Sequence, residues 1–162
     1  MPYALLALVL VILDQVVKYL VLTHIPLGGY VPFLPHVVCL TYVQNTGAAF
    51  SMFSQHTWIL ALISLIMSVV LAVALWKNFF THPLGKVTLA LLLAGAVGNL
   101  IDRTLRGFVV DMFQLLFMNF AVFNVADICV VVGGIAAAAY YLLLADKLEH
   151  KEAPHGTADA DR

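Results

Sequence analysis

The feature that most constrains this chain is a run of 20 residues, from Thr57 to Trp76, that contains no charged side chain. A helix rises about 1.5 Å per residue, so this run is as long as the hydrocarbon core of a bilayer is thick, about 30 Å. Tryptophan stands near its start, at Trp58, and at its end, where side chains that favour the membrane interface are expected. The run therefore predicts a transmembrane helix.

The composition of the whole chain is that of a membrane protein. Of its 162 residues, 63% are apolar and 10% are charged, whereas soluble domains contain about 45–50% and about 25% of these classes. The net charge of -1 leaves no basic surplus for a phosphate backbone, so nucleic acid is not an expected partner. High apolar content with low net charge also argues against disorder in most of the chain.

Four apolar stretches are long enough to cross a bilayer, at about residues 4–23, 57–76, 87–105 and 125–144. They predict an all-α membrane protein with four transmembrane helices in one domain, residues 1–147, followed by a disordered cytoplasmic tail at 148–162. A cleaved signal peptide is the alternative for the first stretch. However, the first ten residues contain no Lys or Arg, and no small-x-small cleavage site follows the stretch.

The positive charges predict how the spans are oriented. Five of the eight fall on the side that would hold both termini: Lys77, Lys86, Lys147, Lys151 and Arg162. The other side has only Arg103 and Arg106, and the first loop, at about 24–56, has none. Because cytoplasmic loops are enriched in Lys and Arg, we expect both termini in the cytoplasm and the first and third loops outside.

Both outer loops contain segments typical of strands. Residues 31–50 (VPFLPHVVCLTYVQNTGAAF) and 107–113 (GFVVDMF) are rich in Val, Thr and aromatic side chains, with Pro and Gly between them. This pattern predicts short strands that pair in a small β-rich cradle on the outer surface.

Four acidic residues lie in or beside the spans: Asp14, Asp102, Asp111 and Asp127. A charge near the bilayer centre costs at least about 2.5–3.5 kcal/mol, so each needs a partner or a function. Asp14 and Lys18 are four residues apart on one helix, which favours an ion pair with Lys18 extending toward the interface. For Asp102, at the end of the third span, a polar helix end held by its own hydrogen bonds is an equally good interpretation.

Asp127 and Asp111 have a second possible role. Asn124 and Asp127 are spaced as an N-cap and the third residue of a helix, so capping accounts for Asp127. Capping does not account for Asp111 in the apolar stretch FVVDMF, nor for two acids at one depth on the outer side. Two converging carboxyls share a proton and can serve as base and acid when water attacks an amide. The spacing alone leaves both interpretations open.

Other chemistries lack their usual patterns. The histidines have no HExxH spacing and the serines no GxSxG context, so we expect no metal and no cofactor. A proton-coupled transporter is a competing function, but it would distribute acids through the membrane, and the middle of the span at 57–76 has none. A non-catalytic assembly factor is a further alternative, and it has no need of two converging acids.

Five short motifs occur in order along the chain: Asp14-Gln-Val-Val-Lys18, Asn45-Thr-Gly-Ala-Ala-Phe50, Gly98-Asn-Leu-Ile-Asp102-Arg103, Gly107-Phe-Val-Val-Asp111 and Phe123-Asn124-Val-Ala-Asp127. Together they resemble the motif set of the lipoprotein signal peptidases, the bacterial type II signal peptidase family of aspartyl proteases. The resemblance covers about residues 13–127. One departure is Met112, because the family more often has an aromatic residue after that aspartate.

The resemblance implies an endopeptidase of the bacterial cytoplasmic (inner) membrane. It would remove the signal peptide of prolipoproteins immediately before a diacylglyceryl-modified cysteine, with Asp111 and Asp127 as a catalytic dyad near the outer face. The implied substrate-binding residues are Asn45, Asn99, Arg103 and Asn124. The implied structural residues are Asp14, Lys18, Gly47, Gly98 and Asp102. The expected partners are these prolipoproteins and membrane lipid, and we expect a monomer.

Overall fold

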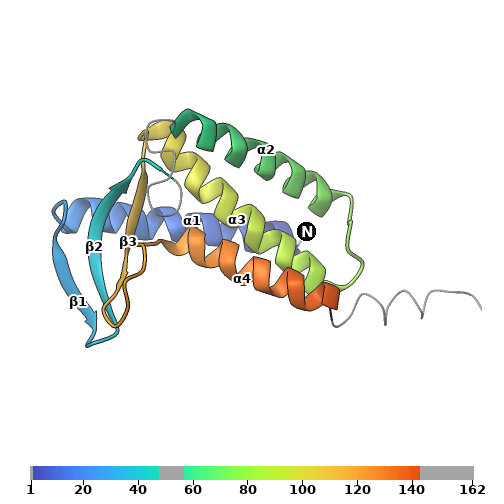
Figure 1. Cartoon of the computed structure of the whole chain (residues 1–162). Coiled ribbons are helices and arrows are strands. Elements are labelled where there is room, and N and C mark those ends of the chain that lie inside the picture. Colours follow the sequence, from blue (N-terminus) through green and yellow to red (C-terminus); the bar gives the residue numbers. More distant parts are fainter. Residues whose placement is uncertain (1, 48–56, 143–162) are drawn as a thin grey trace, which may run out of the picture.

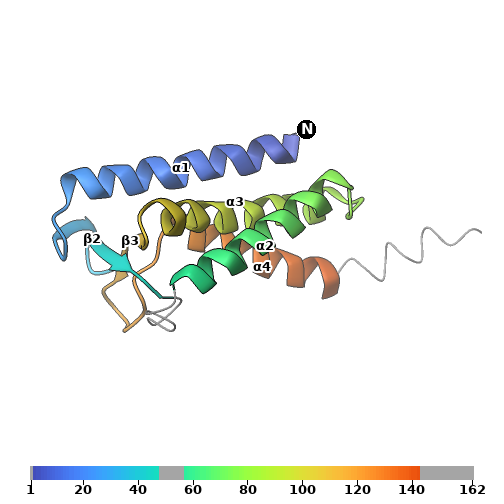
Figure 2. The ribbon, with the colours of Figure 1, turned by 90° about the horizontal axis from the view of Figure 1, so that it is seen from above.

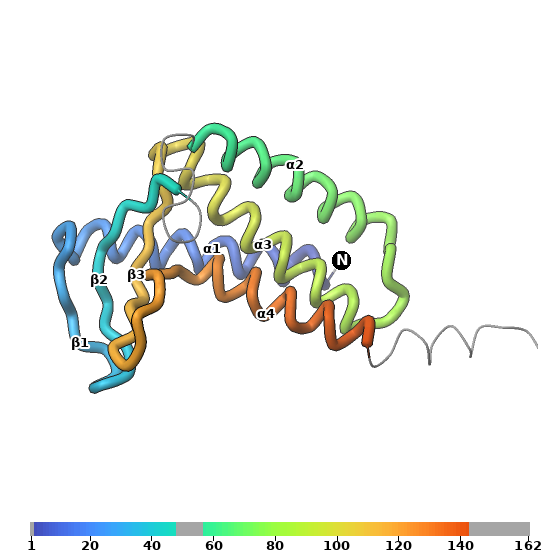
Figure 3. Tube along the Cα trace, viewed as in Figure 1, coloured from blue at the N-terminus to red at the C-terminus, as the bar shows by residue number. Residues whose placement is uncertain are grey.

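The computed structural model describes residues 2–47 and 57–142. It contains four helices, α1 (Pro2–His24), α2 (Thr57–Trp76), α3 (Pro83–Leu105) and α4 (Val125–Tyr140), and three strands, β1 (Tyr30–Leu34), β2 (Val38–Asn45) and β3 (Val109–Leu115). The helices run side by side, and the sheet lies across one end of the bundle (Figures 1 and 3). α3 contacts each of the other helices; it lies between α2 and α4 in Figure 1, and α1 runs along a further side of it (Figure 2).

Three of the helices are long and apolar enough to cross a membrane: α1, α2 and α3. Their side chains fit that environment, because α2 buries only Ser68 and Leu71 inside the protein. Large apolar residues along the rest of α2 are about half exposed, such as Ile66 at 53% and Val70 at 54%. In water this surface would be costly, whereas lipid is its natural solvent.

The predicted spans agree with these helices, with shifted ends. α1 and α3 each extend beyond the predicted stretches toward the N-terminus. The first turn of α3 begins with Pro83 and is capped by the His82 side chain, which accepts a hydrogen bond from the Leu84 N–H at 3.2 Å. The described part of α4 has 16 residues, or about 24 Å. The predicted tail and the end of the fourth stretch lie outside the described residues.

The three strands form an antiparallel sheet in the order β1-β2-β3. The prediction of strands in both outer loops that pair with each other is thus confirmed, apart from residues 48–50, which lie outside the described part of the chain. All five residues of β1 are exposed, whereas four of the seven in β3 are buried. The third loop therefore contributes the strand that packs most closely against the helices.

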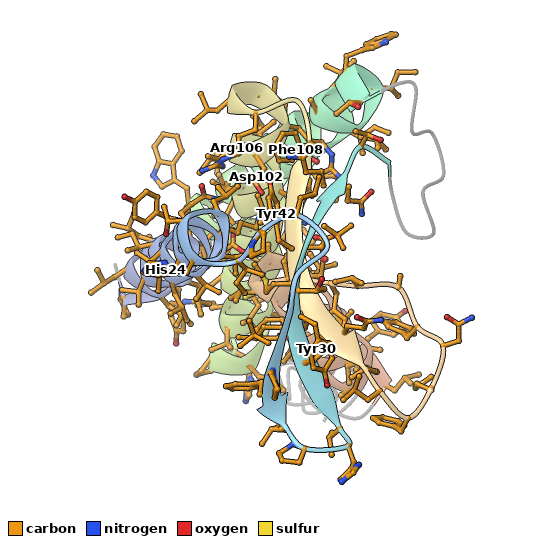
Figure 4. All side chains as sticks on the ribbon, turned by 90° about the vertical axis from the view of Figure 1, so that its left-hand side faces the viewer. His24, Tyr30, Tyr42, Asp102, Arg106 and Phe108 are labelled. Carbon is orange, nitrogen blue, oxygen red and sulfur yellow. The ribbon has the colours of Figure 1, made fainter. Side chains whose placement is uncertain are left out.

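The two faces of the sheet have different surroundings. On one face, Tyr42, Val110 and Met112 pack against Val21 and Ile25 at the end of α1. Met112, where the chain departs from the family pattern, is fully buried in this contact. In Figure 4, Tyr42 and Phe108 lie over the end of the helix bundle, and Tyr30 lies farther along the sheet.

Asp111 points to the opposite face because side chains alternate along a strand. The pairing of β2 with β3 shifts by one residue between Leu40 and Val43, and beyond this irregularity Val43 lies opposite Asp111 and Asn45 opposite Val109. A shift of one residue moves the side chains that follow to the other face. The bulge therefore sets Asn45 beside Asp111, on the face away from α1.

Candidate active site

A cluster of buried charges lies at the junction of α1 and α3. The Lys18 ammonium is 2.9 Å from the Asp14 carboxylate and 3.0 Å from the Asp102 carboxylate, and it donates to Asn99 Oδ1 at 3.0 Å. All three charged side chains are at most 1% exposed. The predicted pair of Asp14 and Lys18 is present, but the prediction that Lys18 extends toward the interface is wrong. Lys18 points instead toward α3, where Asp102 and Asn99 are its further partners.

Arg106 and Gln15 complete the cluster. Arg106 forms an ion pair with Asp102, and the two lie together behind the sheet in Figure 4. The Gln15 amide donates to Asp14, to Asp102 and to the carbonyl of Gly98. Gly98 has no side chain, and this allows Asp14 to lie close to α3, because a Cβ at Gly98 would be 2.6 Å from an Asp14 oxygen.

The two carboxylates of the cluster also bind the backbone of distant segments. Asp14 accepts a hydrogen bond from the Ala126 N–H at 2.9 Å, and Asp102 accepts one from the Val110 N–H at 3.0 Å. These amides belong to the residues immediately before Asp127 and Asp111. The cluster therefore fixes the backbone at both of the acids that the sequence singles out.

Asp111 and Asp127 are held by three asparagine amides. Asp111 accepts hydrogen bonds from Asn45 at 2.9 Å and from Asn124 at 2.6 Å. Asp127 accepts one from Asn99 at 2.8 Å. The Asn124 amide also donates to Asn99 Oδ1 at 3.2 Å. One hydrogen-bonded network thus joins the two carboxyls, and the same Asn99 oxygen connects it to Lys18.

Asn124 and Asp127 also form the cap of α4. The Asn124 side chain accepts a hydrogen bond from the Asp127 N–H, and the Asp127 side chain accepts one from the Asn124 N–H. This is a capping box at the start of the helix. The cap uses one oxygen of Asp127, and the other oxygen accepts the hydrogen bond from Asn99. Asp127 therefore caps α4 and also belongs to the asparagine network.

Arg103 approaches the network from α3. Its guanidinium donates to the Gly47 carbonyl and the Ser64 hydroxyl, each at 3.4 Å. Its Nε is buried and has no hydrogen-bond partner among residues 2–47 and 57–142.

These side chains line a cavity of about 530 Å³, which we call the main cavity. Asn45, Asn99, Arg103, Asp111 and Asp127 form its polar part. Its apolar part extends along α4, past Ile128 to Val132. Asn124 is fully buried and lies outside the cavity lining. A volume of this size suits a ligand with both a polar and an apolar portion.

Comparisons with known proteins assign this arrangement to a family. The model of the family described as "Signal peptidase (SPase) II" matches residues 6–143. The chain belongs to the signal peptidase II family. It is therefore a peptidase, and the family predicted from the five motifs is confirmed.

Individual proteins agree with the family match. The chain is 44% identical over 155 residues to a lipoprotein signal peptidase of Enterococcus faecalis, covering 96% of this chain and 95% of that protein. It is 46% identical over 136 residues to one of Streptococcus pneumoniae, covering 80% and 85%. A solved structure of a bacterial membrane enzyme, at 2.3 Å resolution, matches with a TM-score of 0.84 and 30% identity and covers 96% of this chain and 94% of that one.

The structural roles of Gln15 and Arg106 in this peptidase were not predicted from the sequence. Arg106 was counted only as an outer positive charge, although it pairs with Asp102. A signal for Gln15 was present, because an amide in an apolar span requires hydrogen-bond partners. Within the described residues, no group of three His, Cys, Asp or Glu side chains is placed to hold a metal ion.

Burial gives Asp111 an unusual titration. Loss of hydration raises the pKa of its carboxyl from 3.8 to about 6, and the charge of Asp127 adds to this rise, against hydrogen bonds from Asn45 and Asn124 and the charge of Lys18. The folded peptidase therefore binds this proton more tightly than the unfolded chain does. Asp111 thus contributes stability that is complete below pH 3.8 and is lost as the pH rises through about 6.

We therefore predict a pH-dependent effect of Asp111→Asn on stability. The difference in Tm, variant minus wild type, should become more positive between pH 4 and pH 7. Over this range the wild type loses the stability contributed by protonated Asp111, whereas asparagine does not ionise and the variant loses nothing. Each 1 kcal/mol corresponds to about 2–4 °C in a chain of this size. Thermal unfolding in detergent at several pH values measures it, and a difference that is constant or falls with pH would contradict the predicted ionisation.

Proposed function

We propose that this peptidase cleaves the signal peptide from diacylglyceryl-modified prolipoproteins, immediately before the modified cysteine. Asp111 and Asp127 act as the catalytic dyad and water is the nucleophile. The observation that carries this proposal is that both carboxyls line one cavity and belong to one network of asparagine hydrogen bonds. The curated relatives in E. faecalis and S. pneumoniae carry the name lipoprotein signal peptidase.

The reaction requires one proton on the dyad. The ionised carboxyl removes a proton from water, whose oxygen attacks the carbonyl carbon of the scissile amide, while the protonated carboxyl donates its proton to the carbonyl oxygen. The carboxyl that took the proton from water then donates it to the amide nitrogen, the other carboxylate recovers its proton from a hydroxyl of the tetrahedral intermediate, and the carbon–nitrogen bond breaks. A raised pKa of Asp111 supports this scheme, because a carboxyl in this environment keeps its proton near neutral pH more readily than one in water.

The surrounding residues have separate roles in this proposal. The amides of Asn45, Asn99 and Asn124 orient the carboxyls, and Asn45 and Asn99 also contact substrate where they line the main cavity. Arg103, which lines the main cavity, binds a substrate carbonyl or headgroup oxygen through its guanidinium. Asp14, Lys18 and Asp102 hold the backbone of both acids, while Gly47 offers its carbonyl to Arg103.

The apolar part of the main cavity suits a substrate that lies in lipid. Its lining continues along α4 to Val132, where the lipid-modified end of a prolipoprotein and its signal helix would lie. We place the enzyme in the bacterial cytoplasmic membrane, with α4 as a fourth span, both termini in the cytoplasm and the sheet on the outer face. It acts as a monomer, because one chain supplies every residue of the network.

The product of cleavage tests this function. The purified protein in detergent should release a fragment whose new N-terminus is the diacylglyceryl-modified cysteine, as seen by mass spectrometry. The same precursor without the lipid should be cleaved much more slowly, and EDTA should have no effect. Cleavage at another bond, or a rate that depends on a metal ion, would contradict the proposal.

A further inference from the structure

A second cavity meets the main cavity at Asp111. We call it the outer pocket; it has a volume of about 350 Å³. The two cavities share Asp111, Asn45 and the wall at residues 120–122, while Val43, Gln44 and Asn119 line the outer pocket alone. A molecule that extends from one cavity into the other therefore passes these shared residues, of which Asp111 is the only acid.

The outer pocket lies away from the helices. Every residue that lines it belongs to β2, to β3 or to the segment that follows β3. In contrast, the main cavity includes residues of α3 and α4. The outer pocket is thus built at the sheet end of the molecule, beyond the segments that cross the membrane (Figure 1).

The lining of the outer pocket is also more polar. Four of its eight residues are Gln, Asn or Asp, whereas five of the fifteen residues around the main cavity are polar. Asn119 is exposed at its rim, whereas the Gln44 side chain donates to the Tyr42 hydroxyl at 2.6 Å on the other face of the sheet. Such a lining favours a hydrated polypeptide over an acyl chain.

We propose that the outer pocket binds the residue that follows the modified cysteine in the substrate, and that Asn119 sets the size of side chain accepted there. This inference rests on the proposed function. A prolipoprotein has its signal helix in lipid on one side of the scissile bond and a water-soluble chain on the other. With the bond at the dyad and the helix along α4, the outer pocket is where the soluble side passes Asp111.

Substrate preference tests this inference. Two precursors, identical except for Gly or Trp after the cysteine, are cleaved by wild type, by Asn119→Trp and by Met118→Trp. Asn119→Trp narrows the pocket, so the ratio of kcat/KM for the Gly precursor to that for the Trp precursor should rise at least about 10-fold over wild type. Met118 is exposed and adjacent but lines neither cavity, so Met118→Trp should keep the wild-type ratio.

Several outcomes would overturn the inference. A wild-type ratio in Asn119→Trp would show that the outer pocket does not contact the substrate residue after the cysteine. Equal slowing of both precursors would indicate that the outer pocket is a passage for water instead. A changed preference for the residue before the cysteine would show that the signal-peptide side of the substrate occupies the outer pocket. If wild type cleaves neither precursor, the proposed function itself fails, and this inference fails with it.

A second measurement does not depend on turnover. A precursor with a benzophenone side chain after the cysteine is irradiated with the Asp127→Asn variant, which should bind it without cleaving it. The crosslink should map by mass spectrometry to Asn119 or Val43, which line the outer pocket alone. Crosslinks only to α3 or α4 would contradict the inference.

Discussion

Lys18→Met should lower the Tm of the protein by roughly 10 °C, because it leaves two buried carboxylates without their shared cation. Lys18 lies within 3.0 Å of both Asp14 and Asp102, and none of the three side chains is more than 1% exposed. Removing one partner of a buried ion pair costs about 3–5 kcal/mol, since the remaining charge keeps its cost of dehydration. In a chain of this length, 1 kcal/mol corresponds to about 2–4 °C.

A second substitution separates this cause from lost packing. Asp102 keeps its ion pair with Arg106 in Lys18→Met, whereas Asp14 loses the cation it was paired with. Asp14→Asn, added to Lys18→Met, removes this charge, so the double variant should be more stable than Lys18→Met alone. Lys86→Met is the matched control, because Lys86 lies 5.9 Å above the Tyr3 ring and is partly exposed. It should cost no more than about 0.5–1 kcal/mol. Equal losses for Lys18→Met and Lys86→Met would contradict the role given to the buried cluster.

The same cluster shows what the sequence could predict and what it could not. The pair of Asp14 and Lys18 is local, four residues apart on one helix, and helical spacing is enough to predict it. The Lys18 contact with Asp102 joins positions 84 residues apart and depends on how α1 packs on α3. For this reason the direction of the Lys18 side chain was wrongly predicted, although its partner on α1 was right.

The sheet end of the fold shows the same difference between local and long-range contacts. Strand composition in the first and third loops predicted the small sheet, and its presence is confirmed. The shift in pairing between Leu40 and Val43, which sets Asn45 beside Asp111, has no sequence signal that distinguishes it from regular pairing. Asn124 is a further case, because the sequence predicts its cap of α4 and not its second bond to Asp111.

The largest expected effect is the loss of cleavage when either carboxyl becomes an amide. In the proposed mechanism, Asp111→Asn and Asp127→Asn each leave a dyad that cannot both accept and donate a proton. Acid–base catalysis contributes about 10²–10⁴-fold, and losing one member of such a pair disables the other, so we expect kcat to fall at least about 10³-fold. The double variant should be no slower than either single one, because residues that act as a unit are not additive.

The measurement that tests the central claim most directly is the cleavage rate of a purified diacylglyceryl-modified prolipoprotein by wild type, Asp111→Asn and Asp127→Asn. Asp146→Asn makes the same chemical change outside the described residues and should match wild type. Thermal unfolding of each variant shows that it is folded, and binding of uncleaved precursor shows that the cavity is intact. The proposal predicts that both dyad variants fold, bind the precursor and lose at least about 99.9% of the rate. A folded variant of either aspartate that keeps more than about one tenth of the rate would contradict a catalytic dyad at Asp111 and Asp127.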